Sequence, residues 1–191
     1  MGKRRWLNRD IVVGRAVEMA NEAGDATAVS LTALASTLDV RTPSLYNHVA
    51  SLEDLQHGMT VAGLRLLLAE LRRATVGLVG RPSLEAIAAA YREFAQTHPG
   101  IYPLTICAPD PEDAELTALS QELLQMLLLV MASVGLTGDE AIHAIRGLRA
   151  VLHGFVMLEV AEGYKIPLDR DESFQRLVNA YLNGIIPATT F

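Results

Sequence analysis

The chain has 191 residues, of which half are hydrophobic and one fifth are charged. This composition supports a packed core and excludes a disordered or low-complexity protein. The single cysteine, Cys107, cannot form an internal disulfide, which excludes a disulfide-stapled secreted scaffold. No apolar signal-peptide segment follows the basic start, and the longest apolar run, 123–132, is too short to span a bilayer. We therefore expect a soluble cytoplasmic protein of one or two domains, without a membrane partner.

Charge is distributed unevenly along the chain, although the formal net charge is only −6. Five basic side chains lie in the first fifteen residues against a single acid, whereas residues 59–191 carry 10 basic and 15 acidic side chains. A cationic N-terminus favours a nucleic-acid partner at that end of the molecule. An ordinary solvated basic tip is the alternative that charge alone leaves open.

Helical periodicity runs through the whole chain, and no strand pattern competes with it. Three short helices are predicted first, over about 8–23, 30–38 and 42–49, and about six longer helices follow. A very apolar helix over about 112–134 is expected at the centre of the longer group. The pattern predicts a small recognition module in front of a larger helical bundle.

Residues typical of helix ends mark where several of these predicted helices begin or end. Gly24 sits where a glycine would end the first helix, Ser30 can cap the second, and the pair Thr42-Pro43 can open the third with a capping hydroxyl. Residues 51–54 and 137–140 resemble capping boxes and predict the starts of two longer helices.

The second and third predicted helices have the pattern of a helix-turn-helix, in which two short helices joined by about three residues pack near a right angle. Ala35 is the small residue expected where the helices cross. Asp39 takes the turn position where most such motifs have glycine, and aspartate is among the few other residues that adopt left-handed backbone angles. Three apolar residues are placed to fix the second helix of the pair: Val40, Leu45 and Val49.

The first turn of the third helix would face base edges if that helix enters a major groove. Arginine can bond guanine through two hydrogen bonds, and hydroxyl groups can bond bases or phosphates, so Arg41, Thr42 and Ser44 are predicted to read sequence. Thr32, at the start of the preceding helix, can meet a phosphate. The complete predicted DNA-binding set is Arg4 and Arg5 as a flexible arm, Thr32, Arg41, Thr42, Ser44, Tyr46, Asn47 and His48.

One stretch resembles the DNA-binding signature of the TetR family of bacterial transcriptional regulators: LTALASTLDVRTPSLYNHVASLEDL, residues 31–55. The start of the first helix, NRDI at 8–11, is also similar to that family. Three later runs resemble a subgroup of TetR C-terminal domains: HPGIY at 98–102, GLRAVLHGF at 147–155 and DESF at 171–174. The chain departs from the family at Asp39 and in lacking a lysine at the start of the fourth helix. Residues 1–57 carry 6 basic residues against 7 acids.

The resemblance implies an all-α fold, with an N-terminal three-helix DNA-binding module that contains the helix-turn-helix and a larger helical bundle for ligand binding and dimerisation. We place the two domains at residues 1–52 and 53–191. The resemblance further implies a homodimer that binds a double-stranded palindromic operator. We interpret the protein as a transcriptional repressor that a small-molecule effector releases from DNA.

Small residues support a dimer interface independently, because Gly147, Gly154 and Ala161 recur every seven residues along one predicted helix. Such a stripe lets two helices approach closely, and two helices from each subunit would form a four-helix bundle. Packing of the same stripes within one chain is the alternative. The final helix completes the predicted interface with Phe174, Leu177, Val178 and Tyr181.

The resemblance also implies a small-molecule pocket inside the bundle. Pocket walls are mostly apolar and carry a few polar groups that orient the ligand. The candidate lining residues with that mixture are Phe94, Tyr102, Met126, Met131, His143, Arg146, His153 and Met157.

Catalytic and metal-binding motifs are absent from the sequence. His143 and His153 lie about 15 Å apart along one predicted helix, so they cannot share an ion within one chain. Spacings typical of zinc ligands, a nucleophile elbow, a phosphate loop or a dinucleotide-binding turn do not occur. We expect no metal, no cofactor and no enzymatic activity. A helical carrier protein that has lost DNA binding and an enzyme built on a helical bundle remain the alternatives.

Overall fold

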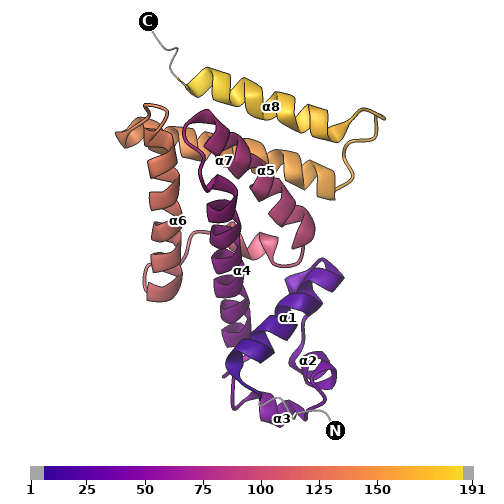
Figure 1. Ribbon diagram of the computed structural model, residues 1–191. Helices are drawn as coiled ribbons and strands as arrows, with labels where there is room; N and C mark the ends of the chain where they lie inside the picture. The colour runs from indigo at the N-terminus through magenta and orange to yellow at the C-terminus, as the bar shows by residue number, and fades with distance from the viewer. Residues whose placement is uncertain (1–6, 187–191) are drawn as a thin grey trace, which may run out of the picture. The chain divides into compact units, whose positions relative to one another are not determined.

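A computed structural model describes residues 7–186, and within that range the chain forms helices, turns and loops without strands (Figure 1). The all-α class is therefore confirmed for the described residues. Residues 7–186 form three short and five longer α-helices, where about six longer ones were expected in the whole chain. In chain order the elements are α1 Arg9–Ala23, the 3-10 helix η1 Ala26–Ala28, α2 Leu31–Thr37, α3 Thr42–Leu45, α4 Leu52–Thr75, α5 Arg81–Thr97, the 3-10 helix η2 Tyr102–Thr105, α6 Ala114–Ala132, α7 Gly138–Val160 and α8 Arg170–Ile185.

The chain divides into two compact units. The first contains the described residues up to Leu66 together with Thr97–Leu119. The second contains Leu67–Gln96 together with the described residues from Ser120 onward. Helices α4 and α6 contribute residues to both units.

The three short helices and the first turns of α4 bury a common apolar core in the first unit. Helical spacing places apolar side chains on one face of each helix, and burying that face drives the helices together. The residues of this core that are at most 1% exposed are Val12, Ala16, Ala20, Leu34, Leu45, Val49, Leu55 and Met59.

Helix ends in the first unit follow the signals in the sequence. Gly24 ends α1 with φ at +69°, a left-handed conformation that glycine adopts without a steric cost. The Ser30 hydroxyl accepts a hydrogen bond from the Ala33 N–H at 3.2 Å and caps α2. At the start of α1, the Asn8 side chain accepts from the Ile11 N–H at 2.8 Å. The expected ends at Gly24 and Ser30 are confirmed.

The third helix begins and ends differently from the prediction. Arg41 occupies its N-cap position without a side-chain cap, so Thr42 is the first helical residue rather than the capping one. The helix stops at Leu45, four residues earlier than expected. The Leu45 carbonyl accepts hydrogen bonds from the N–H groups of both His48 and Val49, at 2.8 and 3.0 Å. These bonds close a turn in which Val49 is buried.

The two predicted capping boxes form in part or not at all. The Ser51 hydroxyl accepts from the Asp54 N–H at 3.0 Å, as in a capping box. The Asp54 carboxylate, however, accepts from the Ala50 N–H at 2.7 Å instead of reaching the N–H of Ser51. Thr137 occupies the N-cap position of α7 but makes no side-chain cap there.

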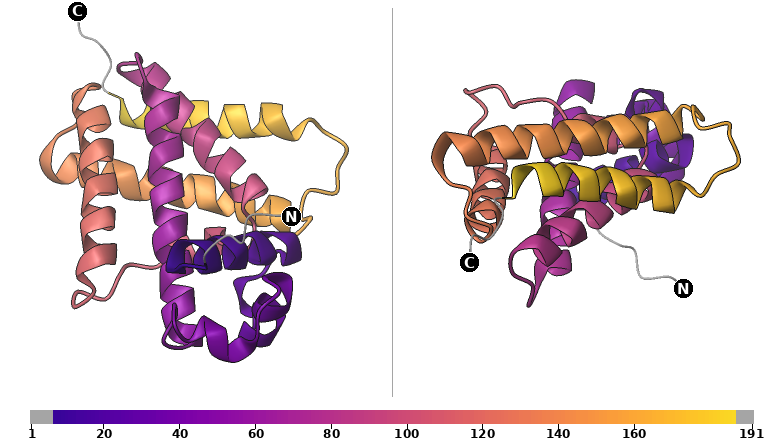
Figure 2. Two further views of the ribbon diagram at one scale, coloured as in Figure 1. Left: turned by 60° about the horizontal axis from the view of Figure 1, so that its bottom comes forward. Right: turned by 90° about the horizontal axis from the view of Figure 1, so that it is seen from above.

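Helices α7 and α8 lie side by side in the second unit, joined by a loop (Figure 2). Phe155 of α7 meets Phe174 of α8 edge to face, with ring centroids 5.1 Å apart. The Tyr181 hydroxyl donates to the Ala144 carbonyl at 2.8 Å. These contacts fix the pair within one chain.

Helix α6 is not the central helix that its composition suggested, because Met131 is the one buried residue among those of α6. Ion pairs join it to α4: Arg65 with Glu115 in the first unit and Arg72 with Glu122 in the second. Two helices, α6 and α7, are long and apolar enough to cross a membrane, with 6% and 33% of their apolar windows buried. Length and composition alone do not distinguish such helices from those of a soluble bundle.

Candidate functional site

The helix-turn-helix packs as its sequence predicts. Helices α2 and α3 contact each other, and Ala35, 2% exposed, lies in the core between them. Leu45 and Val49 are also buried, while Val40 is half-buried. The motif is therefore locked by its own apolar residues, which leaves its polar side chains to the surface.

Asp39 adopts the left-handed conformation expected of the turn residue, with φ at +54°. Its N–H donates to the Ser36 carbonyl at 3.2 Å, and the Val40 N–H donates to the Ala35 carbonyl at 3.0 Å. This pair of bonds is the Schellman arrangement that ends many helices, usually with glycine in the left-handed position. The prediction that aspartate can replace glycine here is confirmed.

Replacing Asp39 with glycine should stabilise the protein by up to about 1 kcal/mol, because glycine has no steric cost at positive φ. We expect Asp39→Gly to raise the melting temperature by about 2–4 °C. Asp39→Asn, which tolerates the same backbone angles, should leave it unchanged. Equal melting temperatures for Asp39→Gly and the wild type would show that the turn is unstrained.

A paired arginine that sequence reasoning missed ties α1 to the end of the motif. Arg9 donates to both carboxylate oxygens of Asp54, at 2.8 and 2.7 Å, and to the His48 carbonyl at 3.2 Å. The Arg9 hydrogen bonds, followed by the one from the Ala50 N–H, lower the pKa of Asp54 to about 2. These residues lie 39 and 45 positions apart in the sequence, so no local pattern signals their contact.

The Arg9–Asp54 pair should make stability depend on pH at the acidic end. The pKa of Asp54 falls from 3.8 to about 2 on folding, so its contribution is complete above pH 3.8 and is lost as pH falls toward 2. Because the Arg9 side chain is 42% exposed, solvent screening limits that contribution to about 1 kcal/mol. Asp54→Asn should melt below the wild type at neutral pH, and the difference should shrink as the pH falls. A difference independent of pH would contradict this assignment.

The structure brings most of the predicted DNA-binding side chains to the surface around α3. Arg41, Tyr46 and Asn47 are exposed and Thr42, Ser44 and His48 are half-exposed, while Thr32 is exposed at the start of α2. The two predicted arm residues, Arg4 and Arg5, lie outside the described residues. The DNA-binding roles of all these residues remain predictions.

Arg41 differs from the other two arginines described in the first 57 residues. Arg9 is paired with Asp54, and Arg15 is paired with Glu18 at 2.8 Å and Glu22 at 3.2 Å. Among the described residues the Arg41 side chain has no hydrogen-bond or ion-pair partner, although its backbone carbonyl accepts from the Ser44 N–H at 2.8 Å. Its guanidinium group therefore remains available to a ligand beside the start of α3.

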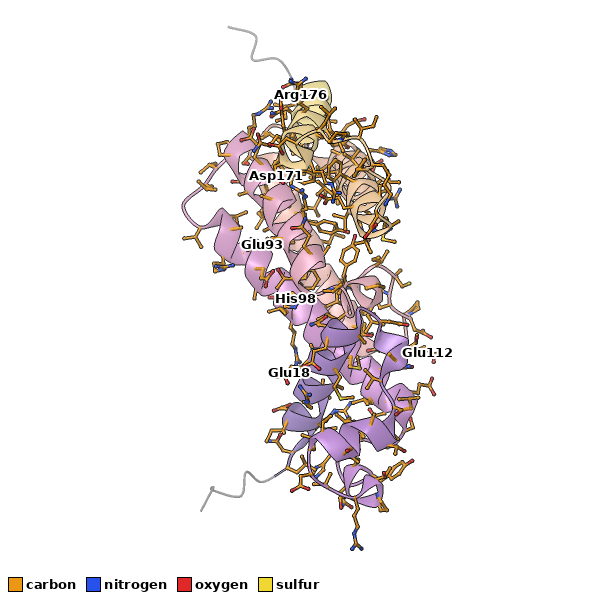
Figure 3. All side chains as sticks on the ribbon, turned by 90° about the vertical axis from the view of Figure 1, so that its right-hand side faces the viewer. Glu18, Glu93, His98, Glu112, Asp171 and Arg176 are labelled. Carbon is orange, nitrogen blue, oxygen red and sulfur yellow. The ribbon has the colours of Figure 1, made fainter. Side chains whose placement is uncertain are left out.

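A cavity of about 580 Å³ lies in the second unit, between α5 and α8. Glu93 and Asp171, labelled in Figure 3, lie on its two sides. Its lining mixes polar and apolar side chains. The lining residues are Glu85, Ala88, Ala89, Arg92, Glu93, Gln96, Asp171, Phe174, Gln175, Val178 and Asn179.

Arg92 in the cavity wall is held by carboxylates from two other helices. It donates to both carboxylate oxygens of Glu159 at 2.8 and 2.6 Å and pairs with Asp171 at 2.8 Å. Its guanidinium also lies 4.8 Å from the ring centroid of Phe174, a cation–π distance. The hydrogen bonds that Arg92 donates to Glu159 raise the pKa of Arg92 above its usual value. The cluster joins α5, α7 and α8 within the second unit.

None of the eight residues predicted to line an effector pocket lines this cavity. The eight residues come from α5, η2, α6 and α7, and their role as an effector pocket remains a prediction. Tyr102 belongs to the first unit, the other seven to the second. Their placement is as follows: Phe94, Tyr102 and Met131 are buried, Met126 and His153 are half-exposed, and His143, Arg146 and Met157 are exposed.

The predicted dimer residues divide into two groups. Phe174 and Val178 are buried and line the cavity, and Tyr181 packs over Gly147, where an added Cβ would lie 2.1 Å from the Tyr181 hydroxyl oxygen. Packing within the chain therefore accounts for the small residue at 147. Leu177 is half-exposed, and Gly154 and Ala161 are exposed. The interface itself remains a prediction.

Comparisons with known proteins give consistent matches. A family model described as tetracyclin repressor-like, C-terminal domain, matches residues 84–181. The uncharacterized HTH-type transcriptional regulator YobS of Bacillus subtilis is 30% identical over 187 residues, covering 97% of this chain and 96% of the relative. The uncharacterized HTH-type transcriptional regulator Rv0681 of Mycobacterium tuberculosis is 32% identical over 185 residues, covering 96% and 84%. The structure of SCO7222, a TetR from Streptomyces coelicolor, is similar with a TM-score of 0.70 and 17% identity, covering 94% of this chain and 98% of that one.

Proposed function

This chain belongs to the TetR family of helix-turn-helix transcriptional regulators, and we propose that it is a cytoplasmic, ligand-responsive repressor that binds a palindromic operator as a homodimer. The observation that carries the proposal is the Arg41 guanidinium at the start of α3, which is unpaired among residues 7–186 and lies beside the apolar core of the helix-turn-helix. Residues 1–52 form the DNA-binding domain, and residues 53–191 bind the effector and dimerise.

The proposed contacts divide into base reading and positioning. Arg41 reaches guanine in the major groove, with the Thr42 and Ser44 hydroxyls beside it. Thr32 at the start of α2 bonds a phosphate and fixes the register. Residues 1–57 contain 6 basic and 7 acidic residues, so basic side chains of this domain neutralise few DNA phosphates. The affinity for DNA should therefore depend only modestly on salt concentration.

The effector-binding and dimerising parts of the proposal use the second unit. The α7–α8 pair supplies two helices per subunit for a four-helix interface, in which the exposed Gly154 and Ala161 allow close approach. The cavity between α5 and α8 is the open volume in which a small effector can bind, and its size is typical of ligand sites. Effector binding favours a dimer whose heads no longer match successive major grooves. A bound compound should therefore weaken operator binding in a titration.

Arg41→Ala tests the reader, measured on the duplex that the wild-type protein enriches from a random pool. The expected loss in affinity is about 5–150-fold, with a relaxed preference at one position of each half-site. Thr32→Val serves as the matched control, because loss of a phosphate contact weakens binding equally across sequences. Unchanged affinity and unchanged sequence preference in Arg41→Ala would overturn the assignment.

A further inference from the structure

The C-terminal end of α1 is joined to the turn that follows α5 by a small polar cluster: Asn21, His98, Gly100 and Ile101, here called the α1–turn joint. We propose that Asn21 is a positioning residue, which holds α1 against this turn so that the two heads of a dimer accept only one half-site spacing. The inference rests on the proposed function and adds the residue that sets its geometry.

The Asn21 side chain makes three contacts across this joint. Its Oδ1 accepts hydrogen bonds from the N–H groups of Gly100 at 3.1 Å and Ile101 at 3.2 Å. Its Nδ2 lies 3.3 Å from Nδ1 of His98, which Figure 3 labels beside the helix that carries Glu18. The Asn21 side chain therefore pairs the Gly100 N–H, and it shares the Ile101 N–H with the His98 carbonyl, which lies 3.2 Å from the same nitrogen.

The backbones of α1 and the turn also approach each other closely. A Cβ at Gly100 would lie 2.0 Å from the Ala20 carbonyl oxygen and 2.6 Å from the Asn21 nitrogen. Ala20 and Ile101 are both fully buried, whereas Asn21 and His98 are half-buried, so the joint lies at the edge of the core of the first unit. Because the two main chains are in contact at Gly100, α1 has no room to shift toward the turn.

The same turn packs against α4. A Cβ at Gly63 would lie 3.2 Å from the Thr105 Cγ2 and 3.6 Å from the Ile101 Cδ1. The turn is held by its own hydrogen bonds as well, since the Tyr102 N–H donates to the His98 carbonyl at 2.9 Å. A rigid turn thus contacts both α1 and α4, and α1 cannot rotate about α4 unless the Asn21 contacts break.

The test compares spacing selectivity, which a merely structural residue would not change. Wild type and Asn21→Ala are titrated against the enriched palindrome and against duplexes with two base pairs added or removed between the half-sites. Wild type should lose about a hundredfold in affinity on the altered duplexes, because both heads can no longer engage together. Asn21→Ala should lose less than about fivefold, because loosened heads reach either spacing.

Two controls make the result specific. Both proteins should bind a single half-site duplex equally, since the readers on α3 are unchanged. Asn21→Asp keeps the oxygen that accepts from Gly100 and Ile101, and it should restore the wild-type spacing penalty. If Asn21→Ala does not give a folded dimer, Asn21→Ser, which keeps a shorter acceptor, replaces it in the comparison.

A folded Asn21→Ala dimer with the full wild-type spacing penalty would overturn the positioning role alone. Failure of the wild-type protein to enrich any palindrome would overturn the proposed function, and the positioning role with it.

Discussion

Gly100→Ala is expected to lower the free energy of unfolding by about 3 kcal/mol or more, because the new methyl group has no room to fit. Its Cβ would lie 2.0 Å from the Ala20 carbonyl oxygen, and backbone cannot give way as a flexible side chain can. For a chain of this size the melting temperature should fall by about 6–12 °C, measured by circular dichroism.

Gly14→Ala is the matched control, since Gly14 lies within α1 and a Cβ there meets nothing within 4 Å. Alanine is the better helix former by about 0.5–1 kcal/mol, so this substitution should stabilise the protein. Opposite signs for the two substitutions would support the close approach at Gly100. A melting temperature for Gly100→Ala equal to that of the wild type would refute it.

Arg92→Ala is expected to cost about 3–5 kcal/mol, because it leaves the largely buried carboxylate of Glu159 without an opposite charge and with the Gln96 amide, at 3.4 Å, as its remaining side-chain donor. The two side chains are 13% and 8% exposed, so water replaces the lost hydrogen bonds only in part. The contact of the guanidinium with the Phe174 ring is lost as well. Thermal unfolding should show a decrease of at least about 6 °C in melting temperature.

The unpaired charge, rather than the lost pair, should account for most of that cost. The double variant Arg92→Leu with Glu159→Leu should therefore be more stable than Arg92→Ala. Arg176→Ala removes an exposed i,i+4 pair with Glu172 on α8 and should change stability by less than about 0.5 kcal/mol. A cost for Arg92→Ala no larger than that for Arg176→Ala would contradict the buried-pair account.

Local signals explain which parts of the fold could be predicted from the sequence. The end of α1 at Gly24, the cap at Ser30 and the left-handed turn at Asp39 depend on neighbours a few residues away. The helix-turn-helix core follows from helical spacing within residues 31–49. For these features the sequence contains both partners of each interaction in one short window.

Contacts between distant residues could not be predicted in the same way. Arg9 and Asp54 are 45 positions apart, Arg92 and Glu159 are 67 apart, and Asn21 and Gly100 are 79 apart. Each side chain is an ordinary polar residue on a helix until the fold brings its partner close. The apolar composition of α6 was misleading for a related reason, because hydropathy does not reveal which neighbour covers a face.

The proposed effector site shows the same limit. The cavity between α5 and α8 is lined by side chains such as Glu93, Gln175 and Asn179 that look like solvated surface in the sequence, so residue type alone did not indicate it. Gly147 was assigned to a dimer interface by its spacing, although the ring of Tyr181 explains its small size within one chain.

The central claim, that this chain is a dimeric operator-binding regulator, is tested most directly by selecting bound sequences from a random duplex pool with the purified full-length protein at low salt. We expect a palindrome whose half-sites lie about 34 Å apart, one turn of the DNA helix, or a multiple of it. Failure of a folded dimer to enrich any sequence would contradict the claim and favour a helical carrier protein whose N-terminal motif no longer binds DNA.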